Sequence, residues 1–164
     1  MTAHDTATDG VRKVRELIKD VKMAMLVTID EDGRPRSRPM QTQDVEFDGT
    51  VWFFTDVNSE KVAEITANPR VNVAYASGNE TYVSLTGNAE IVQDTAKTHE
   101  LWNPLLRAWF ESADDPRIRL VRVDAESAEY WDTPGGKLAS LISLVKSAVT
   151  GTRDDSSENR TVKM

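Results

Sequence analysis

The feature that most constrains the fold is a series of short apolar segments separated by tight-turn sequences. Residues 23–29, 50–55 and 71–75 are apolar or alternate apolar with polar residues, as β-strands do. Asp-Gly pairs at 32–33 and 48–49 supply the glycine that tight hairpin turns favour. A chain of short strands joined mostly by short turns favours an antiparallel barrel, because a parallel βαβ sheet needs long crossover connections.

Helical periodicity and further turn signals predict the secondary structure of the remaining residues. Gly87, inside a long alternating segment, indicates a β-bulge or a close approach of two backbones. Asn103-Pro104 interrupts a helical segment, because proline lacks the N–H that a helix interior requires. We expect one domain over 1–150 and a polar, disordered tail over 151–164. The other strands are expected over 34–42, 81–92, 117–124 and 127–132, and the helices over 9–21, 59–67, 95–109 and 138–149.

The charge balance argues against a nucleic-acid partner. The formal net charge is −7, and the basic residues near 34–38 do not form a run. An anionic small molecule in a local basic pocket fits this composition better. Without cysteine, a membrane-spanning apolar run or a signal-peptide pattern, the chain is expected to be cytosolic and not membrane-bound. Two histidines without metal-ligand spacing predict no metal site.

Hydroxyl and basic side chains gather where the third expected strand gives way to a helix. Thr55 ends the strand, and Ser59 and Lys61 lie at the start of the helix. N–H groups at a helix start have no partner within the helix and attract negative charge. Arg36 and Arg38 lie two residues apart on the preceding strand, so their side chains share one face. This combination predicts a site that grips the phosphate of a nucleotide cofactor.

Several of these residues also have an ordinary structural interpretation. Ser59 fits a capped, solvated helix start, and Arg36 fits an exposed strand face. His99 is expected in solvent beside its charged neighbours. The aromatic residues of the broken helix are expected in the core or as a lid over the barrel, with a substrate pocket as the alternative. They are Trp102, Trp109 and Phe110.

Four short motifs occur in a characteristic order. They are Gly33-x-Pro35-x-x-Arg38-Pro39-Met40, Trp52-Phe53-Phe54-Thr55-x-x-x-Ser59-x-Lys61, Asn68-Pro69-Arg70-Val71 and Gly87-Asn88-Ala89-Glu90. Glu129-Tyr130-Trp131-Asp132, followed by a glycine pair, completes the pattern. In this order the motifs resemble the pyridoxamine 5′-phosphate oxidase-like flavin-binding split barrels, and most closely their general stress protein branch. The resemblance covers residues 11–150.

The resemblance implies a mainly β fold with peripheral helices. It implies a six-stranded antiparallel split β-barrel of Greek-key type, which forms a homodimer and binds FMN where the two subunits meet. The implied FMN contacts are Arg38, Ser59 and Lys61 at the phosphate, Phe54 and Thr55 at the phosphate and ribityl end, Pro39, Met40 and Gln41 along the isoalloxazine, and Trp131 near the ring from the other subunit.

The chain departs from true pyridoxamine phosphate oxidases in ways that argue against vitamin B6 oxidation. Glu60 takes the place of a basic residue beside the phosphate lysine, and Lys137-Leu138-Ala139 replaces an Arg-Leu-His run that grips the substrate. A C-terminal Arg-Leu-x-Pro run has no counterpart. The resemblance therefore implies an FMN-dependent oxidoreductase or stress-related redox protein, without identifying its substrate or any catalytic residue.

Two alternatives remain beside this interpretation. Related split barrels use the deazaflavin F420, whose longer acidic tail would favour basic residues such as Arg34 and Arg36 at the pocket mouth. The net acidity and the short phosphate motif favour FMN instead. The second alternative is a non-catalytic module that stores or senses flavin, or binds a protein partner without flavin. The absence of a Ser/His/Asp or Cys/His set does not exclude an enzyme, because a flavin carries its own redox chemistry.

Overall fold

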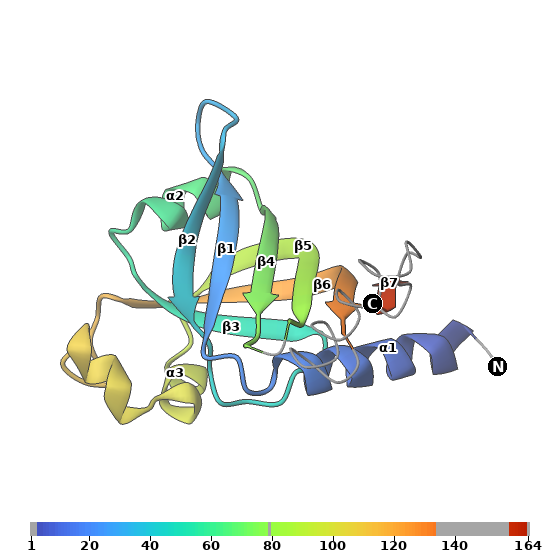
Figure 1. The fold of residues 1–164 in the computed structure, drawn as a ribbon. Helices are drawn as coiled ribbons and strands as arrows, with labels where there is room; N and C mark the ends of the chain where they lie inside the picture. The colour runs from blue at the N-terminus through green and yellow to red at the C-terminus, as the bar shows by residue number, and fades with distance from the viewer. Residues whose placement is uncertain (1–2, 79, 134–157, 164) are drawn as a thin grey trace, which may run out of the picture.

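The computed structural model describes residues 3–78, 80–133 and 158–163. Its strands form one antiparallel sheet in the order β2-β1-β4-β5-β6-β3, with β7 paired to β6. β2 and β3 end this path without pairing to each other, so the barrel is split rather than closed (Figure 1). The elements are α1 (Ala3–Ile18), β1 (Met23–Ile29), β2 (Pro35–Gln41), β3 (Thr50–Asp56), α2 (Glu60–Ala67), β4 (Arg70–Ala76), β5 (Tyr82–Val92), α3 (Thr95–Leu101), the 3-10 helix η1 (Pro104–Ala108), β6 (Ile118–Asp132) and β7 (Glu158–Lys163).

Alternate residues of the strands fill the barrel interior. In β1, the side chains of Ala24, Leu26 and Thr28 point inward and are buried, while Met23 and Met25 are exposed. This two-residue period follows from the pleat of a β-strand. Burial of the apolar inward side chains removes them from water and provides the main driving force for the fold. The prediction of an antiparallel split barrel is confirmed.

β6 is one long strand, so the prediction of two strands with a turn at 125–126 is wrong. Thr86 of β5 pairs with Ser127, but Gly87 pairs with Ala125, which leaves Glu126 unopposed in a bulge. A bulge bends a strand without ending it. A side chain at position 87 would place its Cβ 2.1 Å from the carbonyl oxygen of the facing strand. Glycine is therefore required there, and the predicted close backbone approach is confirmed.

The expected disordered tail over 151–164 is wrong for its last part. Glu158–Lys163 form β7, which pairs with residues 127–132 of β6. This half of β6 has no other neighbour on that edge, because β3 pairs only with its first half. Val162 also packs against the core, which a purely polar tail would not do. The expected helix over 138–149 lies outside the described residues.

Helices lie at both ends of the barrel, with α2 at one end and α1 and α3 toward the other (Figure 1). α1 covers most of the predicted helix but begins at Ala3 and ends at Ile18, which packs with Val14 against the core. Asn103 accepts a hydrogen bond from the backbone N–H of Leu105 and starts η1, which confirms the predicted break. Among the described helices, none is long and apolar enough to cross a membrane.

Candidate functional site

A cleft of about 500 Å³ opens where β2, β3 and the start of α2 meet the η1 segment. Seven of the nine residues that the motif resemblance assigns to the cofactor line this cleft. They are Pro39, Met40, Gln41, Phe54, Thr55, Ser59 and Lys61. The other lining residues were not predicted as cofactor contacts. They are Met23, Gln43, Asp56, Leu106, Trp109, Phe110 and Arg117.

The ammonium group of Lys61 lies at the polar end of the cleft. Its Nζ donates hydrogen bonds to Oγ of Ser59 at 2.6 Å and to Oγ1 of Thr55 at 3.2 Å. No carboxylate of the described residues lies within ion-pair distance of it; the nearby Glu64 pairs with Arg38 instead. Burial lowers the pKa of Lys61, and the charge of Arg38 lowers it further, while nearby carboxylates act in the opposite direction. A half-buried cation in this state is stabilised by a bound anion.

Ser59 does not act as an ordinary helix cap. It occupies the N-cap position of α2 with an extended backbone, but its side chain makes no capping hydrogen bond. Its hydroxyl accepts from Lys61 instead, as does the buried hydroxyl of Thr55. The strand end and the helix start therefore form one cluster of two hydroxyls and an ammonium, which we call the Lys61 cluster.

Arg38 lies behind the Lys61 cluster, on the inner side of the barrel. The β1–β2 pairing places it opposite Leu26, on the buried face. It forms a 2.8 Å ion pair with Glu64 of α2 and donates to the hydroxyl of Thr28, which is fully buried. Arg38 is not among the described residues that line the cleft. Its positive charge still affects the cluster electrostatically, because it lowers the pKa of Lys61.

Thr28 and Glu64, the two partners of Arg38, were not identified from the sequence. Thr28 carries a signal that was available: it is a hydroxyl at an inward position of an otherwise apolar strand. Buried hydroxyls are almost always hydrogen-bonded, so its presence indicates a polar partner inside the barrel. Glu64 gave no such signal, because its pairing depends on how α2 packs across the sheet.

The basic residues of the β1–β2 hairpin are paired with nearby carboxylates. Arg34 forms ion pairs with Asp32 and Asp30, and Arg36 lies 3.8 Å from Asp30. The side chain of Arg36 is 54% exposed, as expected for an ordinary strand face. Neither arginine is among the described residues that line the cleft.

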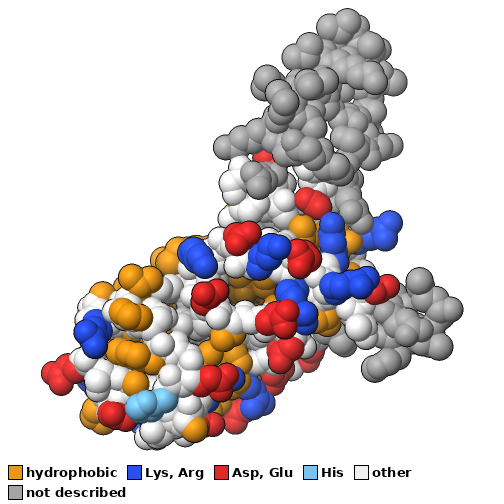
Figure 2. All heavy atoms as spheres, turned by 90° about the horizontal axis from the view of Figure 1, so that it is seen from below, with side chains coloured by type: hydrophobic (Ala, Val, Ile, Leu, Met, Phe, Trp, Pro, Cys, Tyr) orange, Lys and Arg blue, Asp and Glu red, His pale blue; other side chains and the backbone are white. Residues whose placement is uncertain are grey.

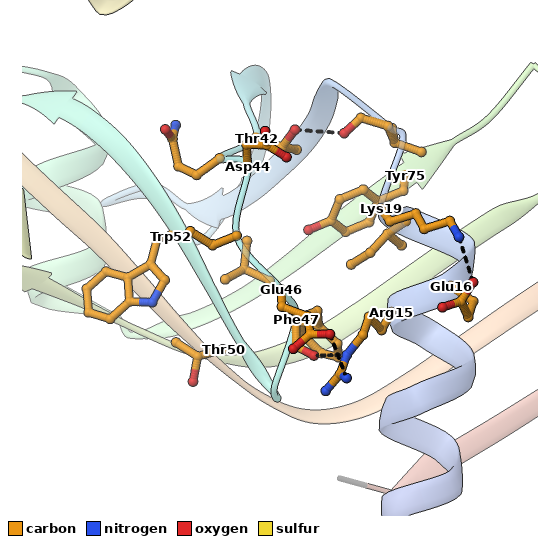
Figure 3. A pocket seen from close by; sticks show the side chains of 15 residues that line it. Arg15, Glu16, Lys19, Thr42, Asp44, Glu46, Phe47, Thr50, Trp52 and Tyr75 are labelled. Atoms are coloured by element: carbon orange, nitrogen blue, oxygen red, sulfur yellow. Dashed lines mark hydrogen bonds and ion pairs between the residues drawn. The ribbon is translucent and has the colours of Figure 1, made fainter. Parts of the chain in front are cut away.

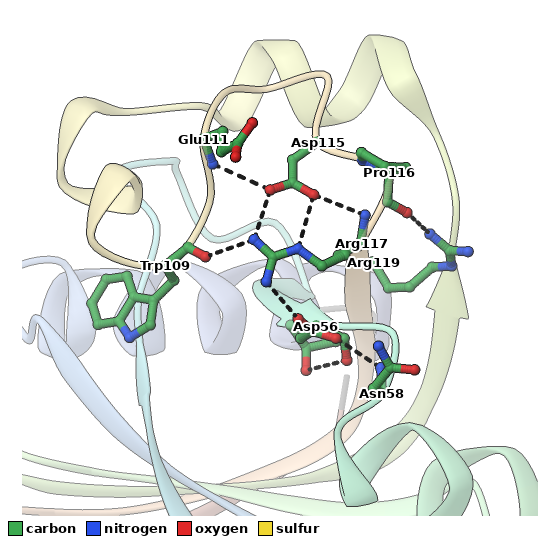
Figure 4. Close-up of polar contacts among 9 residues, drawn as sticks. Asp56, Asn58, Trp109, Glu111, Asp115, Pro116, Arg117 and Arg119 are labelled. Atoms are coloured by element: carbon green, nitrogen blue, oxygen red, sulfur yellow. Dashed lines mark hydrogen bonds and ion pairs between the residues drawn. The ribbon is translucent and has the colours of Figure 1, made fainter.

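A second basic residue, Arg117, lies beside the cleft and is fully compensated (Figure 4). Its guanidinium forms two hydrogen bonds to Asp115, at 2.9 and 3.2 Å, and lies 3.4 Å from Asp56. It also donates to the backbone carbonyl of Trp109 at 3.3 Å. Hydrogen bonds from the side chain and backbone of Arg117 lower the pKa of Asp115 to about 2. The network anchors the loop that carries Trp109 to the cleft.

Of the aromatic residues around the helix break, some line the cleft and one packs in the core beside it. Trp109 and Phe110 line the cleft, with Trp109 exposed and Phe110 buried. Trp102 packs edge to face on Phe54, with ring centroids 6.3 Å apart, and belongs to a small apolar core beside the cleft. Trp109 and Phe110 therefore form part of the cleft wall, and Trp102 packs against the wall residue Phe54.

Trp131 is not among the described residues that line the cleft of its own chain. It lies on the second half of β6 opposite Tyr82, and it is 36% exposed. The motif resemblance implies that Trp131 contributes to the site from a second copy of the chain.

His99 lies outside the cleft. Its ring nitrogen is 2.6 Å from Asp114, and both side chains are exposed, so the expectation of a solvated histidine is confirmed. Among the described residues, no three His, Asp or Glu side chains come together in a way that could hold a metal ion.

The fold and the cleft define a split-barrel protein with a basic, hydroxyl-lined pocket. The family model described as pyridoxamine 5′-phosphate oxidase like matches residues 9–155. The protein therefore belongs to the pyridoxamine 5′-phosphate oxidase-like family. At the level of the family, the resemblance drawn from the four motifs is confirmed.

Relatives place the chain near the general stress proteins of this family. General stress protein 26 of Bacillus subtilis is 28% identical over 123 residues, which cover 72% of this chain and 85% of that protein. A candidate general stress protein 26 from Jannaschia sp. CCS1 superposes with a TM-score of 0.78 and 26% identity, covering 96% of this chain and 99% of the other. The general stress FMN/FAD binding protein of Xanthomonas citri is 31% identical, with a TM-score of 0.64, covering 76% and 89%.

Proposed function

We propose that the cleft binds FMN and that the protein is a flavin-dependent oxidoreductase or a stress-related redox protein. The observation that carries this proposal is the half-buried Lys61, which is held by two hydroxyls and has no ion-pair partner among the described residues. A phosphate group would supply the missing negative charge and accept hydrogen bonds from Lys61, Ser59 and Thr55. The similarity to a protein named for FMN/FAD binding supports the choice of a flavin.

The lining of the cleft offers different surroundings for the two ends of a flavin. The Lys61 cluster would hold the phosphate, and Phe54 lies beside it on β3. Pro39, Met40 and Gln41 on β2 would pass the ring, as in the motif resemblance. When bound, the flavin supplies the redox chemistry, and the chain contributes binding, orientation and exclusion of water.

The outer face of the sheet supports the proposal of a homodimer. It exposes Met23, Met25, Tyr82 and Trp131, which the strand register places on one side of the barrel. Clustered apolar side chains on a surface mark an interaction site, and a twofold dimer buries the same patch of both copies. Met23 also lines the cleft, so the cleft opens at the edge of this face. We propose that the dimer places Trp131 of the partner subunit near the flavin ring.

The surroundings of the hairpin arginines favour FMN over F420 in this proposal. F420 would need basic groups available for its longer acidic tail. Arg34 and Arg36 are already paired with carboxylates, and neither lines the cleft. The cluster that is free to bind an anion is compact and suits a single phosphate. We also keep the cytosol as the proposed location.

The proposal is tested by the visible spectrum of the purified protein and by titration of the colourless fraction with FMN and F420. Lys61→Ala should weaken FMN binding by about 1.5–3 kcal/mol, because it removes a charge-assisted contact. Lys61→Arg should retain much of the affinity. Lys163→Ala removes the same charge from the exposed end of β7 and serves as the matched control.

Three outcomes would contradict parts of this proposal. Unchanged FMN affinity in Lys61→Ala would remove the phosphate assignment. Tighter binding of F420 than of FMN would change the cofactor. Protein that stays colourless and binds neither compound would favour a partner-binding module, whereas bound flavin that no reductant turns over would favour a sensor or store.

A further inference from the structure

A second cleft, of about 350 Å³, lies between the C-terminal half of α1 and the segment over 42–52 (Figure 3). Its apolar walls include Ile18, Val51 and Trp52. Figure 2 views this end of the molecule and shows hydrophobic side chains in a hollow among acidic and basic ones. An apolar cavity of about 150 Å³ can hold a benzene ring, and pockets for small molecules begin near 300 Å³. The second cleft is therefore large enough for a substituted aromatic ring.

The hydroxyl of Tyr75 points into this cleft without a partner (Figure 3). Tyr75 lies on β4 opposite Ala24, and only 5% of it is exposed. No hydrogen bond joins its hydroxyl to another described residue. Because every fully enclosed side-chain polar atom of the described residues has a partner, this hydroxyl must open onto the cleft. A ligand that displaces water from this hydroxyl must replace the lost hydrogen bond, so it needs an acceptor atom facing Tyr75.

The charges around the second cleft disfavour an anionic ligand. Arg15 pairs with Glu46 at 3.1 Å and donates to the carbonyl of Phe47 at 2.7 Å. Lys19 pairs with Glu16 at 2.7 Å, so both cations of the lining are compensated. The lining also contains Asp44, which leaves an excess of negative charge.

The hydroxyl of Tyr75 is suited to donate a hydrogen bond. Burial raises its pKa far above the ordinary tyrosine value, so it stays protonated at neutral pH. A ligand oxygen that accepts this proton in a hydrogen bond needs no charge of its own. The apolar walls and Trp52 favour an aromatic body.

We propose that the second cleft binds a neutral aromatic molecule whose oxygen accepts a hydrogen bond from Tyr75. This site goes beyond the proposed flavin function, because it shares only Gln43 with the lining of the flavin cleft. Its ligand class is an aromatic amide, ketone or phenol of one or two rings. Aromatic carboxylates are selected against by the excess of acidic side chains.

The test uses benzamide as the neutral probe and benzoate as the anionic comparison. Binding is followed by NMR through the indole signal of Trp52, and FMN affinity is measured in parallel. Tyr75→Phe removes only the hydroxyl and should weaken benzamide binding by roughly 2- to 10-fold. Tyr82→Phe removes an exposed hydroxyl on the outer sheet face and is the matched control. Val45→Trp, at an exposed position of the lining, should fill the cleft and abolish binding.

Tyr75→Phe should fold normally, because its hydroxyl holds no other residue. Both cleft variants should retain the FMN affinity of the unmodified protein, so failure of this site is distinguishable from failure of the flavin proposal. Absence of benzamide shifts at millimolar concentration, equal binding of benzoate, or unchanged benzamide affinity in Tyr75→Phe and Val45→Trp would each overturn the proposal.

Discussion

Two basic side chains beside the same cleft have opposite electrostatic surroundings. Arg117 is enclosed by carboxylates, with Asp115 and Asp56 both within 3.4 Å. Lys61 is half-buried and has only the hydroxyls of Ser59 and Thr55 as hydrogen-bond partners among the described residues. Accordingly, hydrogen bonding to Asp115 raises the pKa of Arg117, whereas burial and the charge of Arg38 lower the pKa of Lys61.

Under the proposed function, this difference distinguishes a cation with a structural role from one that would bind an anion. A compensated cation gains little from a further anion and serves to fix the loop around it. An uncompensated, half-buried cation costs free energy in the unliganded protein and regains it when an anion binds. Arg38 extends the comparison, because it lies next to Lys61 but is compensated by Glu64.

The largest effect on stability is expected for Arg38→Ala. It would leave Glu64, whose side chain is only 10% exposed, without its counter-ion inside the barrel. Breaking a buried pair in this way should lower the free energy of unfolding by about 3–5 kcal/mol. Urea unfolding measures this, with Arg36→Ala as control on the same strand face, where a change within about 0.5 kcal/mol is expected. Equal effects of the two variants would show that the Arg38 pair is not structural.

Lys61→Met should separate stability from binding. Since the pKa of folded Lys61 is lowered, the unfolded chain binds more protons between that pKa and the ordinary value near 10.5. The stability of the unliganded wild type should therefore rise with pH through this window, and Lys61→Met should lack this rise. At pH 7 the variant should be at least as stable as the wild type. Saturating FMN should reverse the order, because a ligand at 100 times its Kd adds about 2.7 kcal/mol to the wild type.

Thermal unfolding at several pH values checks this prediction. A Lys61→Met protein that is less stable than the wild type without FMN would mean that the lysine is already compensated. Lys61 and Arg117 would then both be compensated cations.

The smallest effect is expected for Asp115→Asn, in the network around Arg117, whose own side chain is 47% exposed. The lowered pKa of Asp115, about 2, means that its carboxylate contributes stability above the unfolded value near 3.9. This contribution is lost as the pH falls through 2. The difference in Tm between wild type and Asp115→Asn should therefore shrink between pH 4 and 2, while FMN affinity at pH 7 stays unchanged. A large loss of FMN affinity would instead assign this network to binding.

The strands and most of the residues lining the cleft at Lys61 could be predicted because they depend on local signals. The bulge at Gly87 and the break at Asn103 follow from the backbone properties of glycine and of the Asn-Pro pair. Thr55, Ser59 and Lys61 are close in the chain, so the strand end and helix start bring them together directly. By contrast, the continuation of β6 through 125–126 depends on pairing with β5, which no local turn signal reports.

The sequence by itself determined the period of the strands, the turns between them and the local cluster around Lys61, because these depend on residues near one another in the chain. Tertiary structure decided which cations are compensated. Arg38 meets Glu64 across 26 positions, and Arg117 meets Asp56 across 61. It also brought β7 to the open edge of β6 and left the hydroxyl of Tyr75 facing a cleft. Such pairings arise only when distant segments pack, since the cost of burying a charge or hydroxyl depends on what the fold places opposite it.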